Sequence, residues 1–242
     1  MFGIKNVGNI IGLMIILSGC VTVTDNPKAD IKSDPIEKSE SRIVLGLGYL
    51  EQSNMLKARE NFERALKHSP NYYRAQISMA HYLEKVGETA KAENLYRTSV
   101  RQHPKNGNVL NNYGTFLCKQ GEYTKADEYF NRAIKQPYYY LVSASYENAA
   151  LCSLKARKNR KAMNYFQRAL DHEPNRPRAL LQLARLEIDF GNYVEARFRL
   201  THFHQFYGLQ VPSLELLVEL EDQVGNVAEK ENYQKQLLQL RG

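Results

Sequence analysis

Residues 58–70 read Ala58-Arg-Glu-Asn-Phe62-Glu-Arg-Ala65-Leu-Lys-His-Ser-Pro70, and this pattern of small and aromatic residues before a proline decides the fold. Most of these offsets return at intervals of 34 residues along the chain, with one interval of 36. The later copies begin at Ala92, Ala126, Ala162 and Ala196. A fixed period of this length indicates a repeat architecture, in which units that cannot bury their own apolar face stack on one another.

Each copy predicts the second helix of a pair, and a first helix lies upstream of it. There, large and small residues stand together, as in Met79-Ala80 and Tyr113-Gly114, which lets two helices approach closely. A glycine stands where most of the first helices must end, because glycine readily adopts the left-handed conformation that closes a helix. These glycines are Gly87, Gly121, Gly191 and Gly225.

This pattern resembles the tetratricopeptide repeat over nearly all of the chain beyond residue 38. The resemblance implies an all-α fold, a right-handed superhelical solenoid of about six helix-turn-helix repeats with a concave groove lined by the first helices. We place the repeats at 39–72, 73–106, 107–140, 143–176 and 177–210, and a degenerate capping repeat at 211–242. The chain has no Trp, so residues such as Gln76 and Leu110 replace the usual aromatic of the first helix.

The N-terminal residues predict export and lipidation. Lys5, the apolar stretch 10–17 and the small residues that follow are typical of a signal peptide, here 1–19. Leu17-Ser18-Gly19-Cys20 resembles the lipobox of bacterial lipoproteins, which implies acylation of Cys20. Val21 in place of Asp implies, by the same resemblance, a lipid anchor on the periplasmic face of the outer membrane. Residues 20–38 are then the lipidated Cys and a flexible tether; the alternative is an N-terminal helix that the mature protein keeps.

The composition and motifs favour a binding protein over an enzyme. With 43% hydrophobic and 24% charged residues, the chain has the composition of a protein with a packed core. It contains no His-Glu-x-x-His, zinc-ligand spacing, phosphate-binding glycine loop or nucleophile elbow. We therefore expect no catalysis, no cofactor and no small-molecule substrate. His202 and His204 have the spacing for a metal, but beside Phe203 and Phe206 we expect them to pack or lie on the surface.

Charged residues gather in two places on a chain of net charge +7. The basic group in repeat four consists of Lys155, Arg157, Lys158, Arg160 and Lys161. Export argues against nucleic acid as its partner, so we expect a solvated face or, failing that, a site for an acidic protein or anionic lipid. The acidic group, Glu215, Glu219, Glu221 and Asp222, is expected to be a solvated cap.

The junction between repeats three and four carries two inserted residues and a run of tyrosines, Tyr138-Tyr139-Tyr140. We expect the run to plug the inserted turn, and a contact surface is the alternative. Cys118 and Cys152 lie on the first helices of these two repeats, which stack side by side in such an array. In an oxidising compartment, two thiols on neighbouring helices form a disulfide, so we expect one across this seam. The alternative is two buried free thiols.

The groove is predicted from the repeat register, since the second, fifth, ninth and twelfth or thirteenth positions of each first helix face the concave side. In repeats one to three, the candidates are Ile43, Leu47, Leu50, Arg74, Ile77, His81, Asn108, Asn111, Thr115 and Lys119. The candidates of repeats one and two mix apolar and basic groups, and such a surface suits an extended or helical peptide with apolar anchors and acidic flanks. The alternative for the apolar residues of repeat one is an entry cap or packing against an N-terminal segment.

A lipidated chain of about six such repeats with a cysteine pair resembles the type IV pilus biogenesis and stability lipoprotein family. Besides the lipobox, Asn112-Tyr-Gly-Thr-Phe-Leu-Cys118 and Asn148-Ala-Ala-Leu-Cys152 carry the resemblance. It implies a pilotin that binds the secretin subunit of the type IV pilus and promotes its outer-membrane localisation and multimerisation. The alternative is a general periplasmic scaffold lipoprotein that recruits cell-envelope or peptidoglycan enzymes, since the same fold and anchor would serve it equally well.

Overall fold

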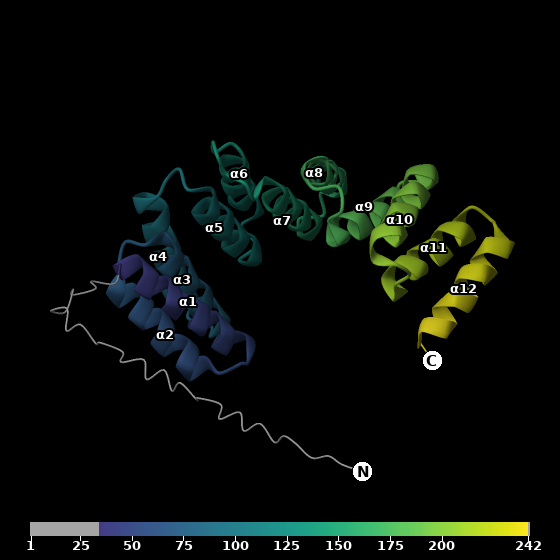
Figure 1. Cartoon of the computed structure of the whole chain (residues 1–242). Helices are drawn as coiled ribbons and strands as arrows, with labels where there is room; N and C mark the ends of the chain where they lie inside the picture. The colour runs from purple at the N-terminus through teal and green to yellow at the C-terminus, as the bar shows by residue number, and fades with distance from the viewer. Residues whose placement is uncertain (1–33, 242) are drawn as a thin grey trace, which may run out of the picture. The chain divides into compact units, whose positions relative to one another are not determined.

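The structure, a computed structural model, describes residues 34–241, and these form helices and no strand (Figure 1). The helices are α1 (Pro35–Glu51), α2 (Met55–His68), α3 (Tyr73–Lys85), α4 (Thr89–Gln102), α5 (Gly107–Lys119), α6 (Tyr123–Ile134), α7 (Val142–Lys155), α8 (Asn159–His172), α9 (Pro177–Asp189), α10 (Tyr193–Tyr207), α11 (Val211–Gln223) and α12 (Val227–Arg241).

The helices form consecutive pairs, and each pair packs against the next. Within a repeat the odd-numbered helix contacts the even-numbered helix that follows it, from α1 with α2 to α11 with α12. First helices of neighbouring repeats also contact each other at α1 and α3, α3 and α5, α5 and α7, and α9 and α11. The expected all-α tetratricopeptide solenoid is confirmed, and its first helices lie side by side as a groove requires.

The core is built from the two columns of residues that the repeat pattern picks out. The alanines that open the pattern, Ala58, Ala92, Ala126, Ala162 and Ala196, are all fully buried. Four residues after each lies a large buried side chain: Phe62, Tyr96, Phe130, Phe166 and Leu200. The small side chain lets the paired helices approach closely and the large one fills the space between them, so the core continues from repeat to repeat.

The predicted glycines close the first helices. Gly87, Gly121, Gly191 and Gly225 have φ angles of 73° to 81°, in the left-handed region that favours glycine. Two turns do without glycine: Ser53 (φ 58°) in the first repeat and Arg157 (φ 57°) in the fourth. The turn between the two helices of each repeat therefore contains a residue with positive φ, and in two repeats this residue is not glycine.

Two glycines of α1 should respond oppositely to substitution by Ala. A Cβ on Gly46 would lie 2.6 Å from the ring of Phe62, whereas a Cβ on Gly48 would meet nothing within 4 Å. We expect Gly46→Ala to lower the free energy of unfolding by about 1–3 kcal/mol through overpacking. Gly48→Ala should raise it by roughly 0.5–1 kcal/mol, because alanine loses less entropy in a helix. Urea unfolding of both variants checks this, and a shift in the same direction would contradict it.

The N-terminal boundary differs from the prediction. We expected a tether up to residue 38, but α1 begins at Pro35. The backbone N–H of Ile36 donates to the carboxylate of Asp34, which caps the helix, and proline suits the first helical turn. Ser39 is fully buried and donates to the carbonyl of Ala65, which ties this turn to α2. The predicted signal peptide, Cys20 and the tether up to residue 33 lie outside the described residues.

The inserted residues fall between α6, which ends at Ile134, and α7, which begins at Val142. Neighbouring repeats are joined by shorter connections, such as residues 103–106 between α4 and α5. The insertion is therefore taken up in the loop, and α5 and α7 stay in contact across it.

The last repeat closes the array as a cap. Leu214, Leu216, Leu217 and Leu220 of α11 are buried against the fifth repeat. Tyr233 and Leu237 of α12 pack on this cluster only in part, and no residue of α12 is fully buried. A final helix with one partner and a polar outer face is what a capping repeat requires.

Candidate protein-binding groove

The predicted groove residues of repeat one are mostly packed. Ile43 is 1% exposed and belongs to a core cluster with Ala65 and Ala75, so its prediction as a groove residue is wrong. Leu47 and Leu50 are half-buried and pack against the core. The fifth position of repeat one is covered because α3 and α2 close over it, which the register rule does not take into account.

In repeat two the candidates are partly exposed and already have partners. Arg74 forms an ion pair with Glu40 at 2.9 Å, and Ile77 packs in part against the core. Burial lowers the pKa of His81 below its usual value, which favours the neutral imidazole. Of the two basic residues expected in repeat two, only Arg74 is then charged, and Glu40 neutralises it.

Among the predicted residues of repeat three, Asn111 joins this repeat to repeat four. The Asn111 side-chain oxygen accepts hydrogen bonds from Ser145 at 3.0 Å and from Asn148 at 3.1 Å. Asn108 accepts at its carbonyl from the side chain of Asn112. Asn111 is thus occupied by contacts between the two repeats, and it fixes the register of α5 against α7.

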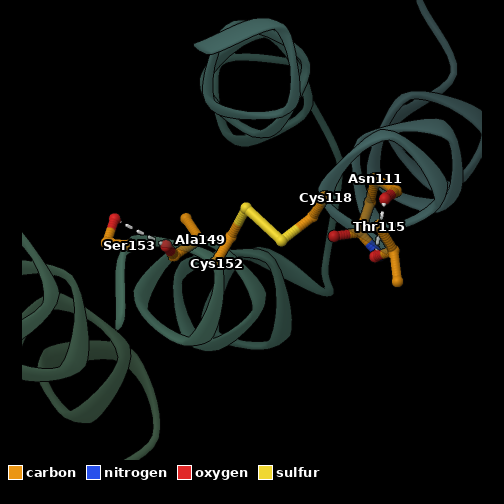
Figure 2. Close-up of a disulfide and its surroundings, with 6 residues drawn as sticks. All are labelled: Asn111, Thr115, Cys118, Ala149, Cys152 and Ser153. Atoms are coloured by element: carbon orange, nitrogen blue, oxygen red, sulfur yellow. Dashed lines mark hydrogen bonds between the residues drawn. A yellow bond between two sulfur atoms is a disulfide. The ribbon is translucent and has the colours of Figure 1, made fainter. Parts of the chain in front are cut away.

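A disulfide joins the same two helices a turn or two further on (Figure 2). Cys118 of α5 and Cys152 of α7 are linked, with their Cα atoms 5.8 Å apart, inside the usual range for a disulfide. Both residues are buried. Beside them, Thr115 donates to the carbonyl of Asn111, and Ser153 donates to that of Ala149 (Figure 2). The structure thus contains the covalent staple expected at this seam.

A cavity of about 450 Å³ opens beside the disulfide. Its apolar lining comes from Phe130, Leu151, Leu154 and the two cysteines, and its polar lining from Thr115, Lys119, Asn148, Lys155 and Arg178. No carboxylate belongs to this lining, and α5, α6, α7 and α9 all contribute to it. Its lining is mainly apolar, and cationic groups share it.

Only Thr115 and Lys119 among the predicted groove residues line this cavity. The predicted groove residues come from repeats one to three only. In repeat four the ninth, twelfth and thirteenth positions are Leu151, Leu154 and Lys155, and the second position of repeat five is Arg178. These four lining residues therefore follow the same register as the predicted ones, whereas Phe130 and Asn148 do not.

The tyrosine run divides into one packed and two exposed residues. The ring of Tyr139 lies against the backbone of Gly107, and its hydroxyl is hydrogen-bonded to Ser145 at 2.8 Å. Tyr138 and Tyr140 are 102% and 79% exposed. Tyr139 therefore plugs the inserted turn as expected, while the other two point to solvent.

The two histidines have separate surroundings. His204 is hydrogen-bonded to Ser213 at 2.8 Å, and burial lowers its pKa. His202 lies edge-on to Phe206, with ring centroids 4.9 Å apart. No cluster of three or more His, Cys, Asp or Glu suited to a metal occurs within residues 34–241. The packing interpretation of this pair thus agrees with the contacts seen.

The charged groups behave differently from one another. In the basic group Lys161 pairs with Asp127 at 2.7 Å, whereas Lys155, Arg157, Lys158 and Arg160 are exposed. The C-terminal acidic group is not simply solvated: Glu221 is 1% exposed, and Arg197 holds it with two hydrogen bonds of 2.9 and 2.8 Å. The expectation of a solvated cap is therefore wrong for Glu221, since a buried carboxylate needs a cation beside it.

Among the helices of residues 34–241, none combines the length and apolar character needed to cross a bilayer.

The chain is similar both to models of a single kind of repeat and to whole proteins. Models of the tetratricopeptide repeat match residues 95–128 and 153–202. Together with the paired helices and the stacked first helices, they define a tetratricopeptide repeat protein, a class that typically binds other proteins.

Type IV pilus assembly protein PilF of Pseudomonas aeruginosa is 34% identical over 210 residues, covering 86% of this chain and 82% of that protein. The solved P. aeruginosa PilF has 31% identity and a TM-score of 0.73, with 85% of this chain and 93% of that chain covered. PilW, a widely conserved type IV pilus biogenesis factor, has 26% identity and a TM-score of 0.71 over 82% of this chain and 91% of its own. The chain belongs to this family of type IV pilus biogenesis proteins, as its motifs predicted.

Proposed function

We propose that this chain is an outer-membrane-anchored adaptor of type IV pilus biogenesis. In this proposal it acts as a pilotin, binding the secretin subunit and promoting its outer-membrane localisation and multimerisation. Membership of the PilF family carries the proposal. Two features of the chain support it: the lipobox-like Leu17-Ser18-Gly19-Cys20 and a rigid groove with an apolar cavity.

The proposed mechanism rests on anchoring and preorganisation. Acyl chains on Cys20 would hold the solenoid at the membrane, since each buried methylene contributes about 0.8 kcal/mol. A secretin segment captured in the groove would then meet the membrane at high effective concentration. The groove needs little reorganisation on binding, because the disulfide and the bonds of Asn111 fix α5 against α7.

Deletion of the gene, with complementation by the full chain, tests this role against the general scaffold. We expect the deletion strain to lose surface pili and to contain secretin as unassembled subunits, and complementation to restore both. Pili are counted by electron microscopy, and secretin multimers by electrophoresis of unheated membranes. Normal pili and secretin with an altered peptidoglycan composition would contradict the pilotin role and favour the scaffold.

A further inference from the structure

The cavity beside the disulfide has an apolar interior that is rigid. Phe130 is buried, and Cys118 and Cys152 are covalently joined, so these parts of the wall cannot move apart. Leu151 and Leu154 are half-buried and pack against the core with one side of each side chain. A volume of about 450 Å³ is ample for one large apolar side chain and part of its backbone.

The charges around the cavity leave a positive excess. Lys119 is paired with Glu84 at 2.6 Å, which neutralises it. Arg178 lies 3.8 Å from Glu147, but that carboxylate is already held by Arg176 at 3.1 Å. Lys155 is exposed and, within residues 34–241, forms no ion pair. Arg176 has a second partner, Glu173, at 2.7 Å, so these two arginines share two carboxylates and Lys155 is left as the excess positive charge.

We propose that this cavity binds a segment of the secretin subunit that inserts one large apolar side chain and places carboxylates beside Lys155 and Arg178. The inference rests on the proposed function for the identity of the partner, and on the cavity for its chemistry. An apolar side chain would be desolvated against the leucines and the disulfide. Carboxylates next to it would pair with Lys155, which has no ion-pair partner within residues 34–241, and with Arg178, whose partner Glu147 lies 3.8 Å away.

The chemistry favours a protein segment over an anionic lipid. A lipid headgroup would satisfy the cations, and it would bind equally well at the other exposed basic residues of the basic group. A lipid that stays in its bilayer keeps its acyl chains there and would leave the apolar interior of the cavity unfilled, whereas a peptide with an apolar side chain between acidic residues uses both the interior and the lining cations.

The test is a binding measurement on the full chain with purified secretin subunit and with overlapping 15-residue peptides that cover its sequence. The variants are Lys155→Glu and Arg178→Gln, and the matched controls are Lys67→Glu and Arg64→Gln on α2. All four side chains are exposed, so these variants should keep the fold. Thermal unfolding of each variant verifies this.

We expect the wild-type chain to bind the secretin subunit and a small set of peptides with an apolar residue flanked by Asp or Glu. Lys155→Glu should raise the Kd by about tenfold or more, Arg178→Gln by a smaller factor, and the controls by less than about twofold. Replacing the apolar residue of a bound peptide with Ser, or its acids with Asn, should abolish binding.

Three results would overturn the inference in distinguishable ways. If the wild-type chain binds secretin and Lys155→Glu weakens binding no more than Lys67→Glu does, the cavity is not the site. If the bound peptides lack acidic residues, the proposed chemistry is wrong. If the wild-type chain does not bind secretin at all, the proposed function fails, and the partner assigned to the cavity fails with it.

Discussion

Replacing both Cys118 and Cys152 with Ser should lower the free energy of unfolding by about 3 kcal/mol, one of the two largest effects we expect. The bridge spans 34 residues, and a cross-link over a loop of that length removes conformational entropy from the unfolded chain. The loss of stability should be greatest at the junction of repeats three and four, because the bridge joins α5 to α7 there, beside the loop 135–141 that contains the two inserted residues.

Urea unfolding followed by circular dichroism measures the disulfide effect. The wild-type chain in reducing buffer should unfold at the same urea concentration as the double serine variant, and reductant should leave that variant unchanged. Equal midpoints for the variant and the oxidised wild-type chain would show that packing alone holds the seam.

Replacing Arg199 with Met should be the second severe change, lowering the free energy of unfolding by about 3–5 kcal/mol. The side chain of Glu187 on α9 is 6% exposed and that of Arg199 on α10 is 15% exposed. Arg199 donates two hydrogen bonds to this carboxylate, at 2.8 and 2.6 Å. Without the guanidinium, Glu187 would be a buried charge with no cation beside it.

A double-mutant cycle separates this effect from lost packing. Glu187→Leu combined with Arg199→Met should be far more stable than Arg199→Met alone, since replacing both charges of a buried pair by apolar groups is often neutral. Arg59→Met is the control, because its pair with Glu63 is exposed and should contribute less than about 1 kcal/mol. If Arg199→Met and Arg59→Met unfold alike, the buried pair is not important to stability.

The fold could be predicted almost entirely from the repeat pattern. Alanine and aromatic positions four residues apart, repeated at a period of 34, determine which side chains meet between helices, so Ala58 and Phe62 could be placed in the core directly. The start of α1 does not follow from composition, because the residues before position 39 are mostly polar or charged. Asp34 caps the helix and Pro35 stands in its first turn. Their order in the sequence indicates a helix start, which their composition alone does not.

The groove was predicted less well, for two physical reasons. Register gives the direction of a side chain, but not whether a neighbouring helix covers it, and Ile43 is covered. A charged residue is expected at the surface unless a partner is known. The burial of the carboxylates Glu147, Glu187 and Glu221 could therefore not be predicted from the sequence. Each of them lies beside an arginine that is distant in the sequence, and only the packing of helices brings the two together.

In the function proposed above, lipid anchoring of this chain delivers secretin to the outer membrane. The most direct test is the amount of heat-stable secretin multimer in separated inner and outer membranes from cells with Cys20→Ala and from wild-type cells. Equal amounts of the chain in both strains, measured by immunoblot, are the control. We predict that the multimers disappear from the Cys20→Ala cells or move to the inner membrane. Multimers unchanged in amount and in membrane location would contradict lipid-dependent delivery of secretin.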